Sequence, residues 1–179
     1  LVDDKNTAGS VTLENNVVRY DPRGAFEHLN DGQSVQDTFT FTVVDGAGGS
    51  SSGLMAITVN GRNDPPRANV DQASFHEDDP AVALDVLSND VDPEREVLSV
   101  TRIDGKQTKG SLSLSNGSIF YKPGTAFDSL EQGESAIDVF HYTVADNSGA
   151  ETSSTVSITI SGQNDMPTAA EALPNFQHA

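Results

Sequence analysis

The chain carries the stretch Gly-Arg-Asn-Asp-Pro-Pro-Arg-Ala at residues 61–68 and a second version, Gly-Gln-Asn-Asp-Met-Pro-Thr-Ala, at residues 162–169. Each version follows a run in which apolar and polar side chains alternate, which is typical of a β-strand with one buried face. A proline in each version fixes one backbone angle and donates no hydrogen bond, so the strand has to end there. The stretch therefore predicts a stiff, oxygen-rich joint between two β-modules.

The two versions are parts of a longer internal repeat. Without a gap, residues 1–68 align with residues 102–169, and 28 of these 68 pairs are identical, including Tyr20 with Tyr121. The first copy has no counterpart of residues 79–101. A repeat of this kind predicts tandem modules, of which the first is incomplete.

We accordingly expect a partial module at residues 1–62, a complete module at residues 63–166, and a tail or the start of a following module at residues 167–179. The end of the chain matches the opening of the second module, with Phe176 aligned with Phe75. No signal peptide precedes the first residue, which we expect to lie inside a longer natural chain.

The pattern of short strands predicts an all-β fold. Residues 39–43, Phe-Thr-Phe-Thr-Val, alternate cleanly, and residues 138–145 repeat the pattern. About seven such strands in roughly a hundred residues, separated by polar turns, are typical of an antiparallel Greek-key sandwich. No helix of about ten residues is supported anywhere, on the usual apolar spacing.

Composition limits the classes of partner. The chain has 27 Asp and Glu against 10 Lys and Arg, a net charge of −17, which argues against binding to nucleic acid or an anionic membrane. It has no cysteine, so no disulfide can stabilise a small module. There is no apolar run long enough to insert into a membrane. Such a surface attracts divalent cations instead.

Calcium is the cofactor that the acidic segments favour, because it takes six to eight oxygen ligands in irregular geometry. The joint supplies Asn63 and Asp64, and Asp90 and Asp92 alternate in the loop 89–94. Asp146 follows a predicted strand, as its counterpart Asp45 does in the first copy. Residues 77–79, Glu-Asp-Asp, stand where we expect the first strand of the second module to begin. We expect these segments to converge at one end of the second module.

Three motifs resemble a known family: Asp-Val-Leu-Ser-Asn-Asp-Val-Asp-Pro at 85–93, Asp-Val-Phe-His-Tyr-Thr-Val-Ala-Asp at 138–146 and Gly-Gln-Asn-Asp-Met-Pro at 162–167. They look like the cadherin-like tandem repeats, the VCBS and related repeats, of large bacterial RTX-type surface adhesins. The resemblance covers essentially the whole chain. It implies tandem Ig/cadherin-like sandwiches, secreted or at the cell surface, with calcium between modules and a role in adhesion or biofilm.

The resemblance to cadherins also implies a ligand set. Asn63-Asp64, the pair Asp90 and Asp92, and Asp146 match the cadherin linker, Asp-x-Asp and late-strand positions. Glu77 matches the early-strand glutamate, which would serve the far joint with Asn164 and Asp165. The cadherin Leu-Asp-Arg-Glu segment has no clear counterpart, only Glu131 and Glu134 nearby.

Plainer roles compete with calcium at each position. Asp and Asn are common turn residues that hydrogen-bond their own backbone, so Asp45 and Asp146 are equally suited to a turn or a ligand role. Asp37 and Asp138 are better explained as structural groups at the start of a strand. Residues 77–79 fit a solvated acidic face as well as a ligand.

The chain lacks the marks of an enzyme, since its histidines show no metal-ligand spacing and no cysteine or serine elbow is present. The leading function is a calcium-stiffened adhesin module. The alternatives are a glycan-binding accessory module and a self-processing unit at Asp64-Pro65. A glycan platform would need exposed aromatics, yet there is no Trp and all three tyrosines lie on strand-like runs expected to face the core.

The sequence is compatible with more than one kind of binding partner. The first is the neighbouring modules of the same chain, and the second is a surface glycan or protein. The strands missing from the first module lie either in sequence before Leu1 or in another copy that adds or swaps a strand.

Overall fold

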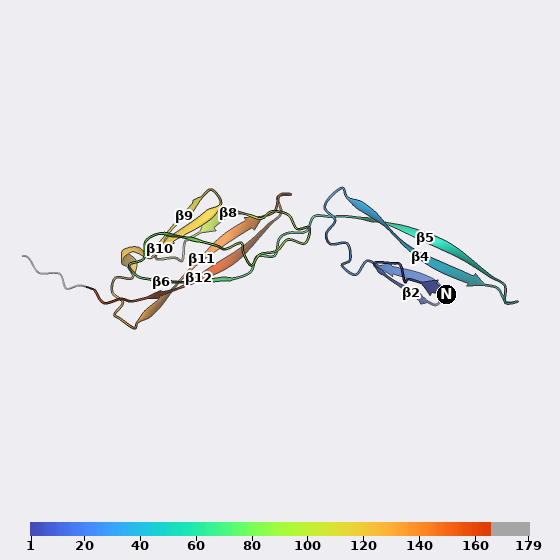
Figure 1. The fold of residues 1–179 in the computed structure, drawn as a ribbon, viewed down its shortest axis with the longest axis horizontal. Helices are drawn as coiled ribbons and strands as arrows, with labels where there is room; N and C mark the ends of the chain where they lie inside the picture. Colours follow the sequence, from blue (N-terminus) through green and yellow to red (C-terminus); the bar gives the residue numbers. More distant parts are fainter. Residues whose placement is uncertain (166–179) are drawn as a thin grey trace, which may run out of the picture.

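The computed structural model describes residues 1–165, and it consists of two β-parts that lie end to end (Figure 1). The predicted tail at residues 167–179 lies outside the described residues. Apart from one 3₁₀ turn, η1 (Gly124–Ala126), all regular elements are strands, so the all-β prediction is confirmed.

The second part is a seven-stranded sandwich. Its strands are β6 (Asp71–His76), β7 (Val82–Leu84), β8 (Ser99–Asp104), β9 (Ser111–Ser115), β10 (Ser118–Lys122), β11 (Ser135–Ala145) and β12 (Glu151–Ser161). One sheet has the order β6-β12-β11-β8 and the other β7-β10-β9. β6 runs parallel to β12, and every other pair is antiparallel. Because β8 and β9, like β10 and β11, are consecutive but lie in different sheets, the chain crosses between layers as a Greek-key sandwich does.

The apolar faces of the two sheets form one core. Alternation along the strands places every second side chain inward, where β11 and β12 contribute most of the fully buried residues. The ring of Phe75 on β6 meets the ring of Tyr121 on β10 edge to face, with centroids 5.2 Å apart. The core consists of Phe75, Val86, Val100, Ile119, Tyr121, Phe127, Phe140, Tyr142, Val144, Val156, Ile158 and Ile160.

The first part contains only the later strands of this plan. It has β1 (Val2–Asp3), β2 (Ser10–Glu14), β3 (Val17–Asp21), β4 (Ser34–Val44) and β5 (Ser50–Asn60). One sheet has the order β1-β4-β5, and β2 pairs with β3 alone. At the repeat offset these strands match the end of β8 and then β9 to β12, so nothing corresponds to β6 or β7. Its buried apolar residues in the described chain are Val11, Leu29 and Phe39.

A buried aspartate ties the two sheets together in the second part. Asp138 accepts hydrogen bonds from the hydroxyl of Tyr121 (2.8 Å), from Thr108 Oγ1 (2.5 Å) and from the amide of Gly110 (2.9 Å). Gly110 can carry no side chain, because a Cβ there would lie 2.6 Å from the Tyr121 ring. Asp37 repeats the arrangement, with Tyr20 Oη at 2.7 Å.

The prediction that Asp37 and Asp138 are structural therefore fits their contacts. Their predicted location at a strand start was wrong, because β4 begins at Ser34 and β11 at Ser135. β4 begins five residues before the alternating run 39–43, and β11 begins three residues before the run 138–145, so each aspartate is a buried residue within its strand.

Candidate metal centre

The junction is held by a short backbone bridge. Arg67 and Val91 exchange two amide-to-carbonyl hydrogen bonds of 2.8 and 3.1 Å, and Pro66 beside them is fully buried. β5 ends at Asn60, and the bridge fixes the linker that follows it against the loop 89–96. The joint residues Asn63 and Asp64 are thereby placed next to the acidic loop of the second part.

Three segments meet at this point. The side-chain nitrogen of Asn63 donates to Asp146 Oδ2 at 2.9 Å, and the backbone amide of Asp64 donates to Glu94 Oε1 at 3.2 Å. Asp92 lies in the same group, where Oδ1 accepts from the amide of Glu96 at 3.0 Å. The joint, the acidic loop and the residue that follows β11 thus each contribute at least one side chain to this cluster.

Three oxygens at the junction are buried without a hydrogen-bond partner. They are Asn63 Oδ1, Asp92 Oδ2 and Glu94 Oε2. Burial raises the pKa of Glu94, and the nearby charges of Asp92 and Asp64 raise it further. Buried oxygens without donors destabilise a protein unless something positive satisfies them, and a hard cation does this directly.

The ligand sphere is not already closed. Among residues 1–165, no three Asp, Glu or His side chains gather around one point where they could hold a metal ion. The side chains of Asp64, Asp92 and Glu94 would have to rotate in order to converge on a cation.

Asp146 combines the two roles that the sequence left open. Its Oδ1 accepts from the amide of Ala150 at 2.8 Å, which is a turn role, and its Oδ2 faces Asn63. Burial would raise the pKa of Asp146, but the hydrogen bonds from Asn63 and the loop amides outweigh burial and hold that pKa below its usual value. Asp146 is therefore ionised and available as an anionic ligand.

Two predicted ligands lie elsewhere. Asp90 accepts from the amide of Asn69 at 2.7 Å and from the Tyr142 hydroxyl at 3.4 Å, and it shares that hydroxyl with Asp71. The alternation that suggested Asp90 and Asp92 would point together is broken, because residues 90–94 are a bridge and turn rather than an extended strand. Asp45 accepts from the amides of its own loop, at Ala47 (2.9 Å) and Gly49 (2.7 Å), and does not reach this junction.

The expected convergence of residues 77–79 with this group was wrong. These residues follow β6 rather than open it, so Glu77 lies at the opposite end of the sandwich, where its Oε1 accepts from the amide of Gln163 at 2.6 Å. Glu77 is 2% exposed and its Oε2 has no partner, so a plain solvated face does not describe it. The position beside Asn164 and Asp165 is the one that the cadherin resemblance implied.

Two acidic residues were missing from the sequence-based ligand set. Glu94 lies in the quoted acidic loop but was not counted as a ligand. The Glu96 carboxylate accepts hydrogen bonds from Asn30 Nδ2 and, at 3.0 Å, from the amide of Ser148. Glu96 therefore connects a turn of the first part with the loop after β11. Acidic residues recur at every second position from Asp90 to Glu96, and following this spacing beyond Asp92 would have identified Glu94 and Glu96.

The second part is thus a seven-stranded sandwich with an acidic junction at one end. Residues 63–162 match the bacterial cadherin-like domain family, and residues 1–58 match a bacterial Ig domain family. The chain belongs to the bacterial cadherin-like domain family. None of the curated proteins compared is significantly similar to it.

Solved structures with a similar fold include protocadherins. Protocadherin gamma C5 domains EC1–3 are 15% identical, with 88% of this chain and 54% of that one covered and a TM-score of 0.43. Extracellular cadherin domains 1–5 of protocadherin gamma B2 are 16% identical, with 92% and 32% covered and a TM-score of 0.42. An endo-fucoidan hydrolase of glycoside hydrolase family 107 is 14% identical, with 92% and 24% covered and a TM-score of 0.39. The chain thus spans from about a quarter to about half of these proteins.

Two further expectations concern the aromatics and the membrane. Tyr121 and Tyr142 are fully buried and Tyr20 is half-buried, as predicted, and no aromatic is among the exposed large apolar residues of the described chain.

Within residues 1–165, the structure contains no helix with the length and hydrophobicity needed to cross a bilayer.

Proposed function

We propose that this chain is a calcium-stiffened extracellular spacer of a bacterial adhesin, in which the metal locks one module to the next. The observation that carries the proposal is the set of three buried, donor-free oxygens of Asn63, Asp92 and Glu94 at the junction. Cadherin-like domains generally bind calcium and are typically structural modules outside the cell, which supports the same function.

The proposed ligands are Asn63 Oδ1 with the carboxylates of Asp64, Asp92, Glu94 and Asp146. Five side-chain oxygen donors, completed by water or a backbone carbonyl, reach the six to eight that calcium takes. The hard divalent ion suits a site with no sulfur or imidazole, since histidine is absent from this group and the chain has no cysteine. Calcium would also cancel the repulsion among the four carboxylates.

The role of the metal would be mechanical. The linker already has a buried Pro66 and the Arg67–Val91 bridge, so calcium needs only to fix the remaining side-chain contacts across the joint. A second site of the same kind is proposed at the other end, where Glu77, Asn164 and Asp165 would act with a following module. An array of such joints makes a stiff rod suited to presenting an adhesive end away from a cell surface.

The test is a calorimetric titration of the chain with calcium. We expect saturable binding with a dissociation constant of about 10⁻⁴–10⁻³ M, as in other extracellular modules. Asp92→Asn with Glu94→Gln should remove the heat of the junction site, whereas Asp4→Asn with Glu14→Gln, the same loss of two charges at exposed positions, should leave it. Equal heats in both double variants would reject the assignment of the site.

The self-processing alternative at Asp64-Pro65 remains a prediction with its own test. The Asp64 amide is held by Glu94, and no nucleophile or base other than carboxylates lies at this bond in the described contacts. Mass spectrometry after incubation with calcium would detect any cleavage.

A further inference from the structure

The base of the loop 89–96 is joined to the linker by two asparagine side chains. Asn69 Nδ2 donates to the carbonyl of Asn89 at 2.6 Å. In return, Asn89 Nδ2 donates to the carbonyl of Val70 and to Asp71 Oδ1, both at 3.1 Å. These bonds continue the backbone bridge at the junction, so the linker and the loop are held together over several residues.

Asp90 adds a carboxylate to this contact. Its Oδ1 accepts from the amide of Asn69 at 2.7 Å, and its Oδ2 lies 3.4 Å from the Tyr142 hydroxyl. Because Asp92 follows only two positions later, fixing Asp90 limits where Asp92 can lie. We call the side chains of Asn69, Asn89 and Asp90 the clasp.

The Tyr142 hydroxyl is the buried centre of this region. Tyr142 lies on β11 and is 1% exposed. Its Oη is surrounded by four oxygens, which are Asp71 Oδ2 (2.7 Å), the Val86 carbonyl (3.1 Å), the Asn69 carbonyl (3.2 Å) and Asp90 Oδ2 (3.4 Å). A phenol has a single proton, and the short bond to a carboxylate is where that proton is best placed. Tyr142 therefore anchors Asp71, the first residue of β6, from the core.

The anchor does not depend on a cation. Burial raises the pKa of Tyr142, and the hydrogen bond to Asp71 raises it further, so the hydroxyl remains a donor at neutral pH. Ser154, opposite Tyr142 on β12, donates from Oγ to the Asn69 carbonyl at 2.6 Å. Two hydroxyls on neighbouring strands thus hold residues 69–71 against the sheet.

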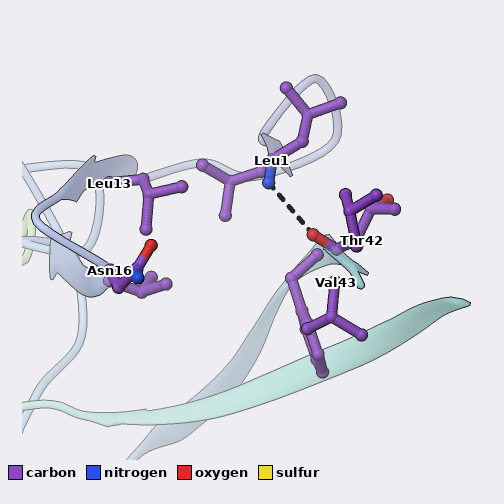
Figure 2. Close-up of a pocket in the computed structure, with 9 residues that line it drawn as sticks. Leu1, Leu13, Asn16, Thr42 and Val43 are labelled. Atoms are coloured by element: carbon purple, nitrogen blue, oxygen red, sulfur yellow. Dashed lines mark hydrogen bonds between the residues drawn. The ribbon is translucent and has the colours of Figure 1, made fainter. Parts of the chain in front are cut away.

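The repeat shows that a phenylalanine also fits the position of Tyr142. At the repeat offset Tyr142 corresponds to Phe41, which lines the opening in the first part that Figure 2 shows beside the labelled Thr42. Tyr121, by contrast, corresponds to a second tyrosine, Tyr20, and both donate to a buried aspartate. Replacing Tyr142 by phenylalanine therefore removes one hydroxyl and keeps the ring.

Ordering of the ligand loop is the step that the clasp can make easier. Residues 92–98, which include Asp92 and Glu94, form no strand or helix. A loop that was free would lose conformational entropy when it bound a cation, and this loss would lower the affinity. A loop that is already held in place avoids most of that loss.

We infer that the clasp and the Tyr142 hydroxyl are positioning groups of the junction site, which hold the loop 89–96 beside the joint and contribute no atom to the ligand sphere. The inference rests on the proposed calcium site, and it adds residues that set its affinity from the core of the second part. Outer groups that orient metal ligands commonly change metal affinity by about 10- to 100-fold.

The test is a calorimetric calcium titration of Tyr142→Phe, with Tyr121→Phe as the matched control. Each variant removes a fully buried hydroxyl that donates to a carboxylate, at 2.7 Å for Tyr142 and 2.8 Å for Tyr121. Both should lower the free energy of unfolding. Only Tyr142→Phe should weaken calcium binding, by about tenfold, because the partner of Tyr121 is Asp138, which belongs neither to the clasp nor to the junction.

Asn89→Ala provides a second variant that leaves the core intact. The Asn89 side chain is exposed, so its removal should cost little stability. It should nevertheless weaken calcium binding by roughly three- to tenfold, which corresponds to the loss of one hydrogen bond. Gln107→Ala is the control, because Gln107 is an exposed amide whose side chain makes no hydrogen bond within residues 1–165, and it should bind calcium as the wild type does.

Hydrogen exchange in a chelator examines the clasp without the metal. In the wild type the amides of Asn69 and Val91 should be protected, because they donate to Asp90 Oδ1 and to the Arg67 carbonyl. Both Tyr142→Phe and the asparagine variant should speed exchange at these two amides, and the two controls should not.

Wild-type dissociation constants in both Tyr142→Phe and Asn89→Ala would overturn the inference without affecting the proposed calcium site. Equal weakening of calcium binding in Tyr121→Phe would also overturn it, and so would rapid exchange of the two amides in the wild type. A wild type with no saturable calcium binding would reject the proposed function, and the positioning role with it.

Discussion

Asn63 and Asp146 lie 83 positions apart in sequence, and the Asn63 side-chain nitrogen donates to the Asp146 carboxylate at 2.9 Å. Asn63 Oδ1 is buried and has no hydrogen-bond partner, and the same holds for Asp92 Oδ2 and Glu94 Oε2. One amide thus connects the two β-parts and presents an oxygen at their junction. The contact between Asn63 and Asp146 therefore belongs both to the link between the two β-parts and to the candidate metal site.

The first prediction concerns the stability of the second module with and without calcium. In a chelator, Asp92→Asn with Glu94→Gln should leave the free energy of unfolding unchanged or raised, because two repelling, partly buried charges are removed. With calcium at a hundred times its dissociation constant, the wild type should gain about 2.7 kcal/mol and become the more stable protein. Urea denaturation in both buffers measures this, and the same ranking in both would contradict it.

The second prediction concerns Asp138 and pH. Burial would raise the pKa of Asp138, but hydrogen bonds from Thr108, Gly110, Lys109 and Tyr121 outweigh burial and hold the pKa below 3.8. Because the folded-state pKa is the lower one, the stabilisation is complete above the unfolded-state pKa and is lost as pH falls through the folded-state pKa.

Asp138→Asn should accordingly destabilise the second module by roughly 2–3 kcal/mol at pH 7, since an amide places N–H groups against existing donors. The difference from the wild type should stay constant from neutral pH down to about pH 5 and shrink below about pH 4. Asp128→Asn, at an exposed carboxylate, is the control and should show little change at any pH. A difference that does not vary with pH would count against the ionised form as the source of stability.

The third prediction compares one core position in the two parts. Ile158 is 0% exposed, and Ile57, its counterpart at the repeat offset, is half-buried in the first part. Ile158→Ala should cost about 2–5 kcal/mol, because a full cavity forms, whereas Ile57→Ala should cost distinctly less. Denaturation followed by NMR signals of each part separates the two effects, and equal losses of stability would contradict the prediction.

Sequence reasoning predicted most of the fold because the repeat and the strand alternation carry it. The segments 111–115 and 118–121 correspond closely to β9 and β10, and the Greek-key prediction is confirmed. The strand predicted at residues 81–87 is only three residues long in the structure, since it lies at a sheet edge and has one partner, β10. Alternation alone cannot show how many hydrogen-bonded partners a strand has.

The candidate site was predictable only in part. The structure places Asn63, Asp64, Asp92 and Asp146 at one junction, as expected for polar residues that follow strand ends, and their role as ligands stays a prediction. Asp90 was misplaced because a side chain in a turn does not follow strand alternation, and Tyr142 with Asn69 holds it elsewhere. Glu94 continues the spacing by two after Asp92 and could have been counted, but the bridge between Arg67 and Val91 that holds its loop against the joint is a long-range pairing that spacing does not show.

The distance between the two parts, measured across the junction, tests the central claim most directly. The chain has no cysteine, so cysteines at the exposed, repeat-equivalent positions Thr12 and Ser113 would carry a unique pair of spin labels. If calcium stiffens the joint, the distance distribution from pulsed electron paramagnetic resonance should be narrow with millimolar calcium and broad in a chelator. It should be equally broad in both buffers for Asp92→Asn with Glu94→Gln. The same distribution for the wild type with calcium and with chelator would contradict the account.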